Sequence, residues 1–96
     1  MTHFDNHIRY ILNRENSISG ILYKEDPAIM AWEVANEPRP FTKENEPYFE
    51  GWIERVTSLI KSIDDKHLVT LGNEGSMGSN NSFELWKLYH DLPTVD

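Results

Sequence analysis

The stretch that decides the fold is residues 29–38, with the sequence I-M-A-W-E-V-A-N-E-P. Six of its first seven residues are apolar, and Pro38 ends the run. A short apolar run that stops at a turn-forming residue is typical of a strand buried on both faces. Because side chains alternate along a strand, two unlike faces are predicted. One face carries the bulky side chains of Met30, Trp32 and Val34, and the other carries Ala31, Glu33, Ala35 and Glu37.

A strand with these two faces suits a β/α barrel. In such a barrel the outer face of each strand packs on helices, while the inner face converges on a crowded axis. Chemistry in these barrels is carried by residues at the C-terminal ends of the strands. Glu37 stands at that end of the predicted strand. It is therefore the first candidate for a functional residue.

The rest of the chain predicts further elements around this strand. Residues 4–13 have apolar side chains at helical spacing, and residues 67–72 resemble a second buried strand. Between the two strands, apolar residues repeat at intervals of three and four over residues 47–63, which predicts an amphipathic helix with Asn45 as its N-cap. The order strand, helix, strand implies a parallel crossover. We expect this helix to pack on Trp32 and Val34 through Trp52, Val56, Leu59 and Ile60.

The last part of the chain predicts one more helix and one more strand. Residues 83–89 form a short helical pattern that begins at Ser82, and Pro93 ends it. Residues 95–96 indicate the opening of a third strand. A complete β/α barrel needs roughly 250 residues, so a chain of 96 residues holds about three strand–helix units.

Composition excludes several classes of function. The net charge of −7, from 16 acidic and 9 basic residues, argues against a surface that binds nucleic acid or an anionic membrane. There is no cysteine for a disulfide or a thiolate metal site, and no apolar run is long enough to span a membrane. His3 and His7 have the spacing of metal ligands, but no third ligand is nearby, so we predict no metal site. Residues 1–4 lead into polar sequence, so no signal peptide is predicted in this chain.

The central strand also carries a resemblance. The motif Trp32-Glu33-x-x-Asn36-Glu37-Pro38 resembles the acid/base motif of retaining glycoside hydrolases with β/α barrels. The string Y-K-E-D-P-A-I-M-A-W-E at residues 23–33, together with Arg39, is similar to the endo-β-1,4-mannanases of glycoside hydrolase family 5. The likeness extends over about residues 4–75. A second Asn-Glu-Pro, at residues 45–47, has no apolar run before it and indicates a helix start instead.

The resemblance implies roles for four residues. Glu37 corresponds to the catalytic acid/base, and Asn36 corresponds to the residue that hydrogen-bonds the 2-hydroxyl of the sugar. Strict alternation turns Asn36 away from the barrel axis, so a bulge or bend is required at the strand end. Arg39 and Glu74 correspond to positions that border the cleft for the leaving sugars. For these two, an ordinary surface charge is an equally good interpretation.

The second catalytic carboxylate is expected outside the chain. Retaining hydrolysis needs two carboxyl groups about 5–5.5 Å apart. Glu33 shares the inward face with Glu37, but four strand residues span about 13 Å, so we interpret Glu33 as an ion partner inside the barrel. In the family the acid/base ends the fourth strand and the nucleophile lies on the seventh. Residues 1–96 are then a fragment of one α/β catalytic domain, a partial (β/α)8 barrel with roughly strands 4 to 5, flanking helices and the start of strand 6.

The function implied by the resemblance is hydrolysis of internal β-1,4-mannosidic bonds in mannan, glucomannan or galactomannan. No cofactor is implied, the parent enzyme is expected to be secreted or periplasmic, and the 96-residue chain alone is expected to be inactive. Three alternatives remain: an endo-β-1,4-glucanase of the same clan, a degenerate barrel that binds carbohydrate without catalysis, and a complete small α/β domain of unrelated role.

Overall fold

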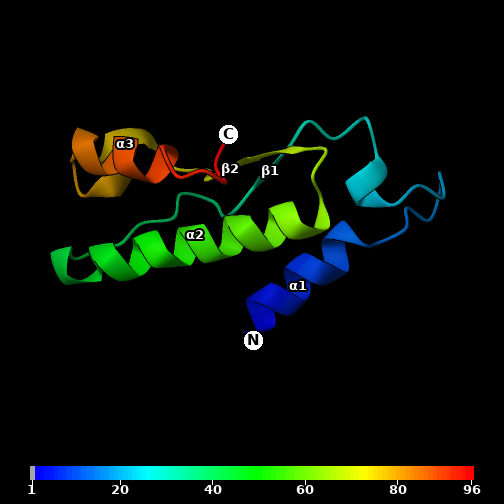
Figure 1. Cartoon of the computed structure of the whole chain (residues 1–96), viewed down its shortest axis with the longest axis horizontal. Helices are drawn as coiled ribbons and strands as arrows, with labels where there is room; N and C mark the ends of the chain where they lie inside the picture. Colours follow the sequence, from blue (N-terminus) through cyan, green and yellow to red (C-terminus); the bar gives the residue numbers. More distant parts are fainter. Residues whose placement is uncertain (1) are drawn as a thin grey trace.

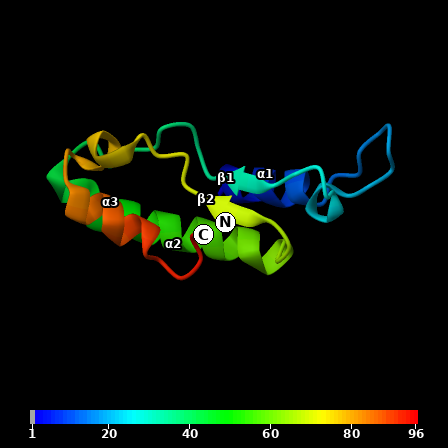
Figure 2. The same ribbon diagram turned by 90° about the horizontal axis from the view of Figure 1, so that it is seen from above.

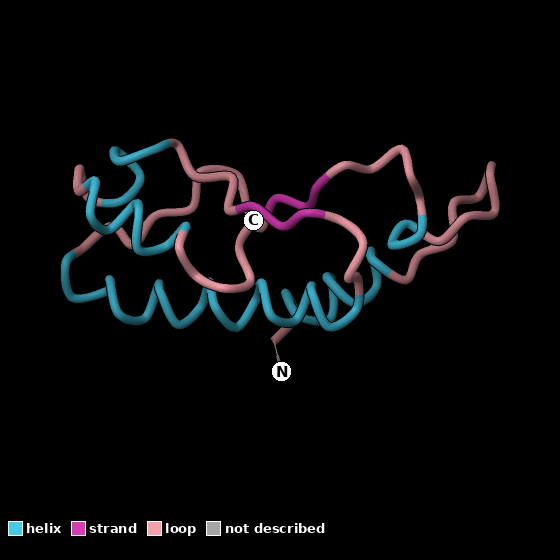
Figure 3. The backbone as a smooth tube through the Cα atoms, turned by 45° about the horizontal axis from the view of Figure 1, so that its top comes forward, coloured by secondary structure: helices cyan, strands magenta, loops and turns pink. Residues whose placement is uncertain are grey.

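The computed structural model describes residues 2–96 as a short parallel sheet with helices against one of its faces (Figure 1). Figure 3 shows that the strands occupy only the middle of the molecule, with helix and loop on either side. In chain order the elements of this described part are α1 (His3–Leu12), η1 (Tyr23–Glu25), β1 (Ala31–Glu33), η2 (Lys43–Asn45), α2 (Glu46–Ile63), β2 (Leu68–Thr70), η3 (Gly75–Ser79) and α3 (Phe83–His90), where η marks a 3₁₀ turn.

The two strands β1 and β2 are parallel neighbours, and α2 connects them. The predicted strand–helix–strand unit is therefore confirmed. Three residues of each strand are paired in register: Ala31 with Leu68, Trp32 with Val69, and Glu33 with Thr70. Both strands are shorter than residues 29–38 and 67–72, over which they were predicted, and they end early because the regular hydrogen-bond pattern between them is interrupted after Val34.

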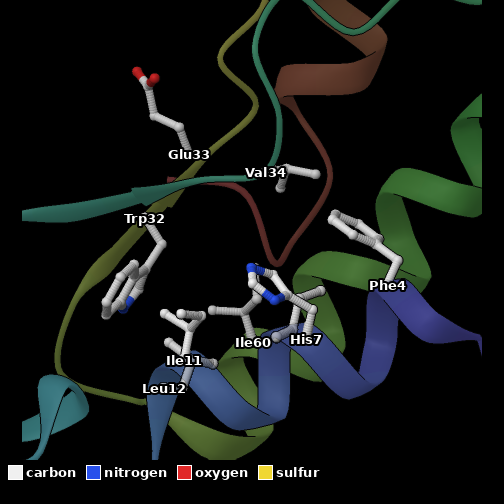
Figure 4. A pocket seen from close by; sticks show the side chains of 9 residues that line it. Phe4, His7, Ile11, Leu12, Trp32, Glu33, Val34 and Ile60 are labelled. Atoms are coloured by element: carbon white, nitrogen blue, oxygen red, sulfur yellow. The ribbon is translucent and has the colours of Figure 1, made fainter. Parts of the chain in front are cut away.

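Helices α1 and α2 lie on the same face of the sheet (Figures 1 and 2). Trp32 and Val34 point toward these helices, whereas Glu33 points away from them (Figure 4). The buried apolar side chains between the sheet and the helices form one cluster, which consists of Ile8, Leu12, Val34, Phe49, Ile53, Val56, Ile60, Val69, Leu71, Tyr89 and Val95. Removing each large side chain of this kind from water contributes about 1.5–3 kcal/mol, so the cluster is the main stabilising feature of the fold.

The long helix α2 confirms the predicted helix to within one residue at its start. Of the four side chains expected to face the strands, Val56 and Ile60 are buried, and Trp52 and Leu59 are partly buried against the core. Asn45 is the N-cap residue of α2 as predicted, but its side chain does not cap the helix. Asn45 has helical backbone angles as the last residue of η2, and its side-chain amide donates a hydrogen bond to the Pro40 carbonyl (3.1 Å) instead of accepting one from α2.

One predicted core residue lies outside the core. Met30 was expected on the buried face with Trp32 and Val34, but 79% of its surface is exposed. The reason is the length of α2. The helix ends at Ile63, and the next residue, Asp64, already accepts a hydrogen bond from the Trp32 indole (2.7 Å). Met30 comes before Trp32 in the strand direction, so it lies beyond the part of the sheet that α2 covers.

Helix α1 confirms the predicted helix over residues 4–13, with its start at His3 and its end at Leu12. The Thr2 side chain caps it by accepting a hydrogen bond from the Asp5 amide (3.2 Å), and the Asp5 carboxylate faces the Thr2 amide in return. Asp5 also accepts two hydrogen bonds from Arg55 of α2, at 2.6 and 2.7 Å. The Arg55 guanidinium holds the pKa of Asp5 below its ordinary value. This ion pair joins α1 to α2.

An apolar pocket of about 260 Å³ lies between α1, α2 and β1 (Figure 4). It is lined by Phe4, His7, Ile8, Ile11, Leu12, Trp32, Glu33, Val34 and Ile60. Among residues 2–96, β1 pairs with β2 on one edge and with no strand on the other.

The C-terminal part of the chain returns to the sheet. Helix α3 begins after Ser82 as predicted, and the Ser82 side chain accepts a hydrogen bond from the Leu85 amide (3.2 Å). Residues 95–96 do not form the expected strand in this structure. Asp96 nevertheless lies along the outer edge of β2, because its amide donates to the Val69 carbonyl (2.9 Å) and its carboxylate accepts from the Val69 amide (2.9 Å). Residues 95–96 thus lie beside β2, where a third strand would start, but they make too few hydrogen bonds to form one.

A buried polar network closes the N-terminal end of the sheet. Asp64, at the end of α2, accepts hydrogen bonds from the Trp32 indole and from the amides of Lys66 (2.9 Å) and His67 (3.1 Å). The His67 ring lies between two acceptors, with Nδ1 at 2.6 Å from the Asp64 carboxylate and Nε2 at 2.7 Å from the Asp26 carbonyl. Burial alone lowers the pKa of His67, but its two hydrogen bonds and the Asp64 charge outweigh burial, so the net pKa is above its ordinary value.

This network predicts a pH-dependent stability. The unfolded pKa of histidine is about 6.5, and the folded pKa of His67 is higher. The contribution of His67 to stability is therefore fully present below about pH 6.5 and is lost as the pH rises through the folded pKa. We expect the free energy of unfolding of the wild-type protein to fall more steeply as the pH rises above about 6.5 than that of His67→Gln, whose side chain does not titrate. Urea unfolding at constant ionic strength measures both slopes, and equal slopes would contradict the prediction.

Candidate active site at the C-terminal ends of the strands

The four residues predicted to act on substrate follow the two strands at the same end of the sheet. Because β1 and β2 are parallel, the loops that leave them lie side by side, next to the start of α2 and to α3 (Figure 1). Asn36, Glu37 and Arg39 lie in the loop after β1, and Glu74 lies in the loop after β2. The strand pairing thus brings together residues that are up to 38 positions apart in the sequence.

The hydrogen bonds between the two chains continue beyond β1 and β2 with one residue extra on the first chain. The Val34 amide donates to the Thr70 carbonyl (2.9 Å), the Ala35 amide donates to the Leu71 carbonyl at a longer 3.4 Å, and the Glu37 amide donates to the Gly72 carbonyl (3.0 Å). Three steps along the first chain therefore match two along the second. This is the arrangement of a β-bulge. The bulge or bend that the sequence required near Asn36 is confirmed.

The backbone of Glu37 is held in an unusual conformation at this bulge. Its φ angle is 49°, in the left-handed region that residues with a side chain rarely adopt. A backbone conformation of this kind costs of order 1–3 kcal/mol and persists only where surrounding contacts enforce it. In the part of the chain that the structure describes, residues 2–96, Glu37 and Asn36 are both exposed to solvent. The bulge therefore presents both side chains at the open end of the sheet.

Arg39 and Glu74 form an ion pair that joins the two loops. The Glu74 side chain is 22% exposed and that of Arg39 is 38% exposed, so the pair is partly shielded from water. A second contact between the loops comes from the Asn73 side chain, whose amide donates to the Pro38 carbonyl at 3.5 Å. The sequence indicated Arg39 and Glu74 separately, and only the structure shows that they are partners.

A hollow of about 380 Å³ lies beside the Glu37 loop and the first turns of α2. Carboxylate, amide and guanidinium groups meet aromatic rings there, a combination suited to binding a sugar, which has polar hydroxyls and apolar ring faces. Its floor includes Phe49, whose ring stacks on Trp52 (5.7 Å between centroids) and meets the buried Tyr89 ring edge-on (5.1 Å). Burial raises the pKa of Tyr89, with a further contribution from the charges of Glu46 and Glu50. The lining residues are Asn36, Glu37, Pro38, Arg39, Phe41, Phe49 and Trp52.

Two residues of this region were missed at the level of sequence. Phe41 lines the hollow with 79% of its surface exposed and has a positive φ of 66°. Its signal in the sequence is an aromatic residue inside a polar loop. Gly72 receives the Glu37 hydrogen bond, and its signal is a glycine at the end of a predicted strand, which often marks a close backbone approach.

Glu33 lies on the uncovered face of the sheet, opposite the helices (Figure 4). This is the face that the barrel interpretation assigns to the interior. Among residues 2–96, neither lysine nor arginine forms an ion pair with Glu33, so its expected role as an ion partner stays a prediction.

Two searches of residues 2–96 bear on other classes of site. They contain no group of three or more histidine, cysteine, aspartate or glutamate residues placed to hold a metal ion. Over the same residues, no helix is long and apolar enough to cross a membrane.

Comparison with known proteins decides the family. The family model described as GH family 5 beta-mannosidase-like, where GH denotes glycoside hydrolase, matches residues 1–96. The chain belongs to this family. The family is one of β/α barrels, so the parallel α/β unit of this chain is a portion of that architecture.

Family 5 relatives with curated names are similar over most of this chain. Mannan endo-1,4-beta-mannosidase 5 of Arabidopsis thaliana is 48% identical over 79 residues, which cover 82% of this chain and 18% of the relative. Mannan endo-1,4-beta-mannosidase 4 of Oryza sativa subsp. japonica is 40% identical over 93 residues, which cover 93% of this chain and 20% of the relative. The chain thus spans about a fifth of the length of these relatives.

Solved family 5 structures share the fold of this chain. The endo-1,4-beta-D-mannanase from Thermotoga petrophila superposes with a TM-score of 0.84 at 31% identity, over 96% of this chain and 30% of that chain. The endo-1,4-beta-mannanase from Rhizomucor miehei gives a TM-score of 0.79 at 32% identity, over 96% of this chain and 30% of that chain. The arrangement of β1, α2, β2 and α3 is therefore the arrangement found within complete family 5 enzymes.

The Arg39–Glu74 ion pair predicts an energetic coupling between the two loops of this family 5 chain. In a double-mutant cycle of Arg39→Ala and Glu74→Ala, we expect a coupling of about 0.2–1 kcal/mol in the free energy of unfolding, since the pair is partly exposed. The exposed pair Lys87–Asp91 of α3, with side chains 60% and 59% exposed, is the matched control and should couple more weakly. Denaturant unfolding measures both cycles, and independent effects of Arg39 and Glu74 would show that the loops are not joined.

Proposed function

We propose that this chain is a segment of a retaining endo-β-1,4-mannanase, with Glu37 as the catalytic acid/base. The observation that supports this most directly is the bulge after β1. It holds Glu37 at the C-terminal end of a parallel strand, where β/α barrels carry their chemistry, beside Asn36 and Arg39. We assign β1 to strand 4 of the barrel, β2 to strand 5, and residues 95–96 to the approach to strand 6.

Glu37 has two roles in the proposed reaction. As the nucleophilic carboxylate attacks the anomeric carbon and the bond to the leaving sugar breaks, Glu37 donates its proton to the departing oxygen. In the second step Glu37 takes a proton from water, the water oxygen attacks the anomeric carbon, and the nucleophile is released. The family likeness implies that the nucleophile is a glutamate on strand 7, outside residues 1–96.

The other site residues are proposed to bind the sugar chain. Asn36 directly precedes Glu37 and is exposed beside it at the bulge, and we assign it to the 2-hydroxyl of the sugar that is attacked. Arg39, held by its ion pair with Glu74, is assigned to the leaving sugars. Phe41 and the rim of the hollow offer an aromatic surface for a sugar ring. These groups suit a neutral polysaccharide, and nothing in the assignment calls for a metal or an organic cofactor.

We propose mannan, glucomannan or galactomannan as substrate, because the related proteins that cover the chain are named as mannan endo-1,4-beta-mannosidases. Since such polymers are found outside the cell membrane, we also propose a secreted or periplasmic parent enzyme. An endo-β-1,4-glucanase is the nearest alternative activity, and relative rates on mannan and on β-1,4-glucan distinguish the two. A barrel that only binds carbohydrate is disfavoured because Glu37, Asn36 and Pro38 are all present.

The acid/base assignment predicts a large and selective loss of rate. In the full-length enzyme, Glu37→Gln should lower the rate on mannan by about 10²–10⁴-fold, because the leaving sugar then departs without protonation. Aryl mannosides with good leaving groups need less protonation and should lose less in the first step. The control is Glu54→Gln, which changes an exposed glutamate on α2 and should leave the rate unchanged. Near-normal mannan hydrolysis by Glu37→Gln would overturn the assignment.

The position of the nucleophile predicts that the 96-residue chain by itself does not hydrolyse mannan. Without a second carboxylate about 5–5.5 Å from Glu37, no glycosyl-enzyme can form. Reducing-sugar release from mannan by the purified chain measures this. Hydrolysis by the chain would mean that a carboxylate within it acts as nucleophile, and loss of that activity in Glu74→Gln would identify Glu74.

A further inference from the structure

We propose that Gly72, at the end of β2, is a positioning residue that sets the direction of the Glu37 side chain. This inference rests on the proposed function, because it concerns the aim of the acid/base group. It assigns a role to a residue that touches no substrate and that acts only through the backbone of the neighbouring strand.

The first observation is the closeness of the two backbones. A Cβ atom built on Gly72 would meet the Ala35 carbonyl oxygen well inside the 3.0 Å below which real Cβ contacts essentially never occur, and it would lie 3.2 Å from the Ala35 carbonyl carbon. Both atoms belong to the backbone, so neither can move aside as a flexible side chain could. The Ala35 carbonyl therefore occupies the space that any other residue at position 72 would need for its side chain.

The second observation is that this close approach lies within the bulge. Ala35 lies between Val34 and Glu37, in the part of the first chain that carries the extra residue, and its own amide makes only a long bond of 3.4 Å to the Leu71 carbonyl. The Gly72 carbonyl accepts the Glu37 amide hydrogen bond (3.0 Å), and Glu37 takes its positive φ of 49° at that point. Because Gly72 has no Cβ atom, it leaves room for the Ala35 carbonyl within the bulge. Its own carbonyl holds the Glu37 amide at the end of the bulge. Moving the Ala35 carbonyl outward would rotate the Asn36–Glu37 peptides and turn the Glu37 carboxylate.

The third observation separates this role from backbone freedom in general. Gly72 has a φ of 74°, and Gly20 has a φ of 72°. At Gly20 an added Cβ would meet only the tip of the Glu15 side chain, at 3.8 Å. The two glycines thus impose nearly the same backbone strain on an alanine, but only at position 72 does a side chain collide with the chain that carries Glu37. Gly20→Ala is therefore a matched control for Gly72→Ala.

The test uses the full-length enzyme in four forms: wild type, Gly72→Ala, Gly20→Ala and Glu37→Gln. Rates are measured on mannan and on 2,4-dinitrophenyl β-mannobioside, whose leaving group departs without a proton. The second substrate is also assayed with sodium azide. Azide attacks the anomeric carbon of the glycosyl-enzyme, forms the glycosyl azide and releases the nucleophilic carboxylate, and this step needs no base to remove a proton. Azide therefore accelerates turnover only where the acid/base group is absent or misdirected.

We expect Gly72→Ala to lower kcat on mannan by about 10²-fold relative to Gly20→Ala, the scale of a misplaced catalytic group. We also expect a smaller loss in the first step on the dinitrophenyl substrate, and acceleration by azide as in Glu37→Gln. Equal losses on both substrates without an azide effect, or the same behaviour as Gly20→Ala, would overturn the role of Gly72. Full mannan activity in Glu37→Gln would instead overturn the proposed function.

Thermal melting of each variant shows whether it is folded. If Gly72→Ala yields no folded enzyme, the crystal structure of the unmodified full-length enzyme decides. The proposal requires the Glu37 amide to bond the Gly72 carbonyl and the Ala35 carbonyl to occupy the Cβ space of Gly72. The absence of either contact would overturn it.

Discussion

The parallel pairing of β1 with β2 over helix α2 is the constraint on which the rest of this structure depends. Pairing in this direction places the ends of both strands at one edge of the sheet, so the loops that carry Glu37 and Glu74 become neighbours. The helix makes the pairing possible, because it returns the chain to the start of the sheet and buries Val56 and Ile60 beneath the strands. Without the pairing, the residues of the candidate site would be far apart.

The two ends of the sheet are built differently. At the N-terminal end, Asp64 and His67 form a buried network in which nearly every polar group has a partner. Such a network stabilises the connection between α2 and β2 and leaves no exposed group for chemistry. At the C-terminal end, the ladder is interrupted, Glu37 has a strained backbone, and its side chain faces solvent. A stabilising N-terminal end and a C-terminal end that carries the candidate site match the general pattern of β/α barrels.

The interruption of the hydrogen bonds between the two strands explains how one short strand can complete the core and also present the candidate site residues. Trp32 and Val34 must face the helices to complete the core, and strict alternation would send Asn36 the same way. An extra residue in the first chain breaks the alternation after Val34, so Asn36 and Glu37 both reach the open end of the sheet. The Arg39–Glu74 ion pair then ties the displaced loop back to the neighbouring strand.

The sequence by itself determined the elements whose cause is local. The apolar run that contains β1, the helical repeat of α2 and the helix start at Ser82 are all patterns of neighbouring residues, and each was predicted close to where it occurs. The need for a bulge near Asn36 also followed from alternation alone.

Only the tertiary structure decided the features that depend on two distant segments at once. Met30 is exposed because α2 ends level with Trp32, which no pattern around Met30 reveals. The partnership of Arg39 with Glu74 and the closeness of Ala35 to Gly72 depend on the register between strands that are more than thirty residues apart in the sequence. Register is set by the packing of whole side-chain layers on the helix, so it arises only when the elements come together.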